Sequence, residues 1–150
     1  MRSNLAVTVL CAGLGLGAAA AQAGDWAGPY AGAFAGWIST GGGVAGAQAG
    51  YAFEVGDGIY VGPEVDAFYI ANMGEAAGSA AVRLAVELVD DVLVYGRVGG
   101  FALTNGDIGW LVGGGAAAQV SESVSVFAGV DRYDCGCVYT VIRGGAQIHF

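Results

Sequence analysis

The feature that most constrains this chain is a two-residue alternation that keeps charged side chains apart from aliphatic ones. Successive side chains of a β-strand project to opposite faces, so a period of two predicts strands. In the segment 79–89, for example, Val82, Leu84, Val86 and Leu88 share one face. Seven charged residues lie in the middle of such segments, and each falls on the face opposite the aliphatic residues: Glu64, Asp66, Arg83, Glu87, Arg97, Asp131 and Arg143. Glu54 and Arg132, at segment ends where water is near, are the exceptions.

Turn-forming residues divide the alternating part of the chain into eight segments. A strand needs about ten residues to cross a bilayer at a tilt, and each segment is long enough. An even number of antiparallel strands lets the first pair with the last, which leaves no open edge. We therefore predict an all-β, eight-stranded antiparallel up-and-down transmembrane β-barrel, with its apolar face outside and its charges inside. The predicted strands are Pro29–Ile38, Val44–Val55, Ile59–Ile70, Ser79–Val89, Val92–Leu103, Ile108–Val120, Val124–Tyr133 and Val138–Phe150.

The uncharged stretch 26–53 offers a rival interpretation as a transmembrane helix. Gly28, Gly32 and Gly36 recur every four residues, as on the contact faces of such helices. The three glycines at 41–43 divide the stretch into pieces of about ten residues, whereas a spanning helix needs about 20. Strands are therefore the favoured interpretation.

Composition excludes several classes of protein. The 29 glycines in 150 residues argue against a helical domain, because each interior glycine costs a helix about 1 kcal/mol relative to alanine. The chain has no lysine and a formal net charge of −8, so a nucleic-acid partner, which needs clustered cations, is not expected.

Residues 1–23 are typical of a secretory signal peptide. Arg2 supplies the positive start, Leu5–Ala20 the apolar core and Ala21–Ala23 the small-residue cleavage site. We therefore predict export and a mature barrel of residues 24–150, with an uncleaved anchor as the alternative. Cys11 lies in the apolar core, and Leu10 before it argues against a lipoprotein site.

Aromatic residues near the strand ends predict two girdles on the outer wall, as in membrane barrels. We expect the aromatic residues at one rim to be Tyr30, Tyr51, Phe53 and Phe150, and those at the other rim to be Tyr69 and Trp110.

Three stretches resemble a known family: Asp25–Trp37 (D-W-A-G-P-Y-A-G-A-F-A-G-W), Ile59–Tyr69 and Gln147–Phe150. They are similar to segments of the small porin-like outer-membrane β-barrels of Gram-negative bacteria, which group with opacity-type surface proteins and the OmpA transmembrane domain. The resemblance implies a monomeric barrel in the outer membrane, surrounded by lipid and lipopolysaccharide. It also implies that Phe150 is a signal read by the outer-membrane assembly machinery. Members serve as structural proteins, weak pores, adhesins or lipid enzymes, and the short loops here are unlike those of adhesins.

The seven inward charges are the main candidate site, because unpaired charge in a narrow lumen is costly. We expect Glu64 or Asp66 to face Arg83, and the whole set to form an ion-pair network that fills the lumen. The predicted function is a structural, envelope-integrity role with a mostly plugged lumen. One alternative is a narrow porin-like pore for small solutes. Another is a soluble periplasmic ligand-binding barrel, since Gly24–Trp26 matches the short signature of lipocalin-type barrels.

Few residues point to chemistry. His149, the only histidine, lies one residue from the end of the sequence and forms no visible triad with a serine and an acid, so no catalytic activity is expected. Cys135 and Cys137 fall in the last loop, where they would pair in a disulfide or remain free thiols. With Asp134 they make three ligands, too few for a closed zinc site, and no cofactor or metal is predicted.

Overall fold

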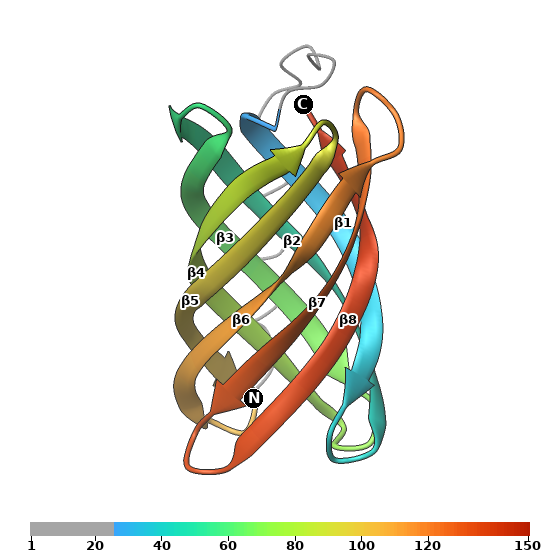
Figure 1. The fold of residues 1–150 in the computed structure, drawn as a ribbon. Helices are drawn as coiled ribbons and strands as arrows, with labels where there is room; N and C mark the ends of the chain where they lie inside the picture. Colours follow the sequence, from blue (N-terminus) through green and yellow to red (C-terminus); the bar gives the residue numbers. More distant parts are fainter. Residues whose placement is uncertain (1–25) are drawn as a thin grey trace.

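A computed structural model describes residues 26–150, which form a closed barrel of eight antiparallel strands (Figure 1). Each strand pairs with the next, and β8 pairs with β1, so the sheet has no open edge. Within these residues, no helix is long and apolar enough to cross a membrane. The predicted signal peptide, with Cys11, lies outside the described residues. The strands are β1 (Gly28–Ile38), β2 (Gly42–Gly56), β3 (Ile59–Ile70), β4 (Glu75–Val89), β5 (Val92–Leu103), β6 (Ile108–Gln119), β7 (Val124–Asp134) and β8 (Val138–His149).

The strand prediction is confirmed in number, order and pairing. β3 and β5 have the predicted bounds at both ends. β4 begins at Glu75, four residues before the predicted Ser79, because Ile70 pairs with Glu75 and extends the ladder through a stretch of alanine and glycine. The helical alternative for 26–53 is wrong, since β1 and β2 pair continuously from Gly28↔Ala52 to Ile38↔Gly42.

The turns are two to four residues long at both ends of the barrel. One end, which we call the terminal rim, carries the C-terminus and the β2–β3, β4–β5 and β6–β7 turns, at the top of Figure 1. The other end, the far rim, carries the remaining four turns. Gly58 and Asp91 have φ values of 70° and 67°, a left-handed conformation that tight two-residue hairpins favour.

The outer wall is apolar and the charged face is turned inward. Val65, Leu84, Val98 and Ile142 are 53–62% exposed, whereas the acidic and basic residues opposite them are buried. Outward aromatic residues lie near both rims. Those near the terminal rim are Tyr51, Phe53 and Phe150, and those near the far rim are Trp37, Tyr69 and Trp110.

Tyr30 is an exception, because the prediction that it faces outward is wrong. Its side chain is 5% exposed and points into the lumen, as do those of Phe34 and Ile38 on the same strand. β1 contains no charged residue to mark its inner face. Between these three residues its inner face carries only glycine, and its outer face carries alanine and tryptophan. The alternation therefore gave no signal of which face was inside.

Some inward positions require glycine because neighbouring strands approach each other closely there. A substitution of Gly99 on β5 tests this explanation. A Cβ atom on Gly99 would lie 2.5 Å from the Ala81 Cα atom and closer still to the Ala80 carbonyl oxygen. The outward Gly100 leaves room, since its Cβ would lie 3.5 Å from the Gly109 carbonyl oxygen. Gly99→Ala should therefore lower the free energy of unfolding by about 1–3 kcal/mol, through the backbone shift it forces. Gly100→Ala should change it by less than about 0.5 kcal/mol. Urea unfolding in detergent measures both, and equal effects would show that close approach is not the cause.

Candidate functional site

The lumen is filled by three layers of side chains. The layer at the far rim is apolar and includes Ile38, Ile70, Leu103, Leu111 and Val141, which lie at strand ends. The layer at the terminal rim mixes apolar residues with polar ones and includes Trp26, Tyr60, Leu93, Gln147 and His149. A layer of charged side chains lies between them.

This middle layer is a buried cluster of three acidic and three basic side chains, which we call the lumen ion network. Its members come from β3, β4, β5, β7 and β8, and none is more than 7% exposed. Equal numbers of opposite charges make it formally neutral, which limits the cost of burying it. The network consists of Glu64, Asp66, Arg83, Arg97, Asp131 and Arg143.

Arg97 lies at the centre of the lumen ion network. Its Nη1 atom donates to Glu64 Oε1 and Asp66 Oδ2, both at 2.7 Å. Its Nε and Nη2 atoms donate to the two oxygens of Asp131 at 3.0 and 3.1 Å, the paired geometry that makes guanidinium–carboxylate contacts strong. Nη2 also donates to the Tyr133 hydroxyl at 3.1 Å. One guanidinium thus joins three carboxylates.

Arg143 contacts the same three carboxylates less closely. Its Nε atom lies 2.8 Å from Asp131 Oδ2, an ion pair whose atoms are not aligned as a hydrogen bond. Its Nη1 and Nη2 atoms lie 3.4 Å from Asp66 Oδ2 and 3.8 Å from Glu64 Oε1. The guanidinium carbon lies 4.7 Å from the centre of the Phe34 ring, which packs against its face.

Arg83 has fewer acidic partners than the other two. Its Nη1 atom donates to Glu64 Oε2 at 2.9 Å, and its guanidinium carbon lies 3.9 Å from the centre of the Tyr95 ring. Arg83 and Arg97 are direct cross-strand partners, a like-charge arrangement that is normally destabilising. Glu64 compensates for it by accepting from both, one with each oxygen.

Neutral hydroxyl groups complete the environment of the carboxylates. Tyr30 donates to Glu64 Oε2 at 2.8 Å, and Ser79 donates to Asp66 Oδ1 at 2.7 Å. Buried carboxylates that accept several hydrogen bonds avoid the penalty of an unpaired buried charge.

Six of the seven residues predicted for this site lie together, and Glu87 does not. Glu87 is half-buried at the terminal-rim end of β4, where the β4–β5 register shifts between Glu87 and Val89. Within the described residues it takes no part in the ion pairs of the lumen. The alternation placed it on the inward face, but its height on the strand puts it beyond the network.

Two states were left open for Cys135 and Cys137, and within residues 26–150 both are free thiols. Gly136 between them has a φ of 101°, and its backbone nitrogen donates to Asp134 Oδ1 at 3.0 Å. The Cys135 thiol lies 3.9 Å from the Cys137 carbonyl oxygen, not against the second sulfur. The β7–β8 turn, in which a single residue separates the two cysteines, is thus formed without a disulfide.

A second polar group, at the terminal rim, was not predicted. Ser125 Oγ lies 2.8 Å from His149 Nε2 and 3.4 Å from Gln147 Oε1. The Trp26 ring packs edge-on against His149, with ring centres 5.3 Å apart. The alternation of β8 does place Gln147 and His149 on the face of Arg143, so a signal existed. His149 Nδ1 has no partner among the described residues, and Ser125 is fully buried, so this pair lacks both the acid and the access of a catalytic triad.

A closed antiparallel barrel of eight strands, apolar outside and ionic inside, is the architecture of small transmembrane β-barrels. Comparison with solved structures agrees. A de novo designed transmembrane β-barrel matches with a TM-score of 0.71 and 15% identity, over 84% of this chain and 98% of its own. The outer membrane enzyme PagL matches with a TM-score of 0.70 and 12% sequence identity, over 81% of this chain and 99% of its own. Neisserial surface protein A matches with a TM-score of 0.59 and 17% sequence identity, over 83% of this chain and 98% of its own.

The chain therefore has the fold of the small outer-membrane β-barrels, which confirms the predicted fold class. No model of a protein family matches the sequence, and no curated protein is similar to it. At these identities the structural likeness establishes the fold and leaves the function to be argued from the chain itself.

Proposed function

We propose that this protein is an integral outer-membrane β-barrel with a closed lumen and a structural role in the cell envelope. The observation that supports this most directly is the distribution of side chains across the wall. Val82, Leu84 and Val98 are more than half exposed on the outside, while Arg83 and Arg97 beside them are buried inside. Hydrocarbon favours that arrangement, whereas water on the outside would favour the reverse.

The lumen ion network supports the closed state. It lies between two layers of buried aromatic and aliphatic residues, and a cavity on either side of it has room for about one water molecule. An eight-stranded barrel encloses little more than its own side chains. Solutes would have to displace paired charges and both layers.

The proposed partners are outer-membrane lipid, lipopolysaccharide and the outer-membrane assembly machinery, and the protein acts as a monomer. Phe150 supports the assembly role, because it is 37% exposed at the terminal rim and its backbone nitrogen donates to the Pro29 carbonyl oxygen at 3.0 Å. It thus lies at the β1–β8 seam, where the barrel closes.

We expect the protein to require detergent for extraction and to migrate differently on gels before and after heating. In planar bilayers we expect no conductance steps. Recovery from the periplasm without detergent would reject the membrane location and favour a soluble ligand-binding barrel. Conductance steps in the wild-type protein would reject the closed lumen.

A narrow pore is the second candidate, and Arg143 is the observation that favours it. It lies within 4 Å of Glu64, Asp66 and Asp131, so it has alternative partners between which to move. If such exchange opens a path, Asp131→Asn should produce conductance steps. Arg132→Met, a change on the exposed outer face of the same strand, should not.

A further inference from the structure

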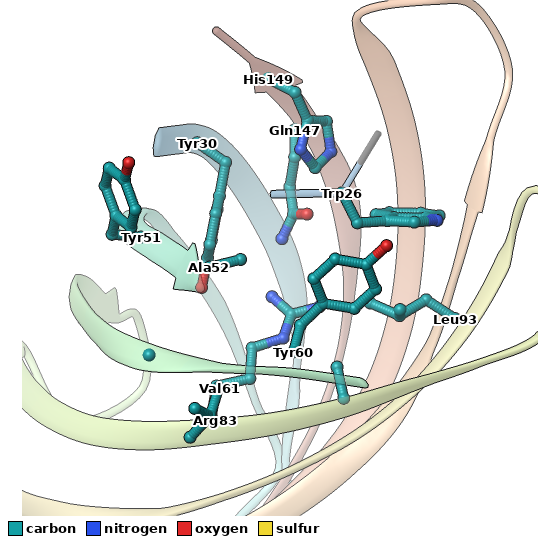
Figure 2. Close-up of a pocket in the computed structure, with 12 residues that line it drawn as sticks. Trp26, Tyr30, Tyr51, Ala52, Tyr60, Val61, Arg83, Leu93, Gln147 and His149 are labelled. Atoms are coloured by element: carbon teal, nitrogen blue, oxygen red, sulfur yellow. The ribbon is translucent and has the colours of Figure 1, made fainter. Parts of the chain in front are cut away.

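We infer that the terminal-rim end of the lumen holds a binding site for a small anion of chloride size. The site is the cavity between the lumen ion network and the Trp26 ring, and its polar side chains include Arg83, Gln147 and His149 (Figure 2). The remaining lining is mainly aromatic and aliphatic and includes Tyr60 and Leu93.

Gln147 carries the first part of the argument. Its side chain is 1% exposed, and its amide nitrogen has no hydrogen-bond partner within residues 26–150. Figure 2 shows that nitrogen directed toward the guanidinium of Arg83, which lines the same cavity. Both groups only donate hydrogen bonds, so neither satisfies the other. An acceptor placed between them would satisfy the amide nitrogen and give Arg83 a partner in addition to Glu64, and a buried donor without an acceptor is costly.

His149 adds a ring nitrogen, Nδ1, without a partner among the described residues. Its side chain is 6% exposed, and its Nε2 atom is occupied by Ser125 Oγ at 2.8 Å. When Ser125 donates that hydrogen bond, the proton of the neutral ring lies on this Nδ1 atom, for which the described part of the chain offers no acceptor. The Trp26 indole nitrogen also lacks a partner in the part of the chain that the structure describes, but Figure 2 shows it turned away from Arg83.

Charge decides between an anion and a neutral or cationic ligand. The residues lining the cavity include one guanidinium and, among those the structure describes, no carboxylate. Arg83 has one carboxylate partner, Glu64, whereas Arg97 and Arg143 each contact three. It is therefore the least neutralised cation of the lumen. Room for about one water molecule limits the ligand to the size of chloride or bromide.

A titration on the ¹⁵N-labelled protein in detergent tests the inference. Sodium gluconate, whose anion is too large for the cavity, is replaced stepwise by sodium chloride at constant ionic strength. We expect saturable shifts of the Gln147 side-chain amide and of the Arg83 Nε–H signal, and no saturable shift of the buried Gln48 amide. Bromide should produce the same pattern.

Gln147→Leu should weaken chloride binding, followed by the Arg83 signal, about tenfold or more, since it removes a donor to a charged ligand. Gln119→Leu is the matched control and should leave the affinity unchanged. Gln119 also has an unpartnered amide nitrogen but does not line the cavity.

Three results would overturn the inference. The first is a wild-type response that is absent or does not saturate. The second is a cross-peak from water to the Gln147 amide that chloride does not alter, which would mean that water alone occupies the cavity. The third is a chloride-independent hydrogen bond from Arg83 to Gln147 Oε1, which would leave no site. The wild-type titration decides the question even if Gln147→Leu fails to fold, and its outcome does not depend on whether the lumen conducts.

Discussion

Arg97→Met is expected to lower the free energy of unfolding by about 3–5 kcal/mol, the usual cost of removing one partner from a buried ion pair. Arg97 joins Glu64, Asp66 and Asp131 at distances of 2.7–3.0 Å, and it is 3% exposed. Without it, three carboxylates face two guanidinium groups inside the barrel. Methionine fills part of the volume of the arginine side chain, so the loss of stability measures mainly the cost of the unpaired carboxylate charge. Urea unfolding of the protein refolded into detergent or lipid vesicles measures it.

Two further variants separate charge from packing. Arg132→Met removes the same side chain from the exposed outer face of β7 and should change the stability by less than about 0.5 kcal/mol. Adding Asp131→Asn to Arg97→Met restores equal numbers of opposite charges in the network. The double variant should therefore lose less stability than the sum of the two single variants. Simple additivity would contradict a coupled network.

Val98→Arg is expected to cost about 2–4 kcal/mol in a bilayer, the penalty for a cation on the lipid face near the midplane. Val98 lies at the middle of β5, is 58% exposed, and pairs with the outward Val82. An arginine there would place its charge in hydrocarbon or distort the bilayer to reach water. Folding into lipid vesicles, followed by gel migration before and after heating, measures the loss.

Val89→Arg is the control at the rim. Val89 is 62% exposed and adjoins the β4–β5 turn, where an arginine reaches the headgroups, so its cost should be about 0–1 kcal/mol. In a soluble barrel both positions would face water, and both substitutions would be nearly neutral. Equal small effects would therefore argue against the membrane location.

The fold could be predicted because β3, β4 and β5 carry strong alternation with charges that mark one face. β1 carries no charged residue, and Tyr30 was therefore assigned to the outer face of the wall, which is the wrong one. Alternation fixes the face of a residue but not its height relative to other strands. Glu87 was therefore placed in the lumen ion network, although its end of β4 lies beyond it.

Pairing within the site depended on a register that the sequence does not contain. The sequence left open whether Glu64 or Asp66 faces Arg83, and the structure pairs Arg83 with Glu64. Likewise, the contact of Ser125 with His149 joins two strands at one height, which periodicity within each strand cannot reveal. The spacing of Cys135 and Cys137 likewise left open whether they form a disulfide, and both are free thiols in the described residues.

The turns of two to four residues have a consequence for how the cell surface presents this protein. If the terminal rim faces the periplasm, the turns of the far rim, which include Asn72, Asn105 and Gly136, face the cell exterior, and each is only three or four residues long. The sugars of surrounding lipopolysaccharide molecules would extend beyond these turns and cover them. Antibodies and phages would then have little exposed chain to bind, and proteases little to cleave. The protein could thus serve in the outer membrane while exposing almost no surface to the outside.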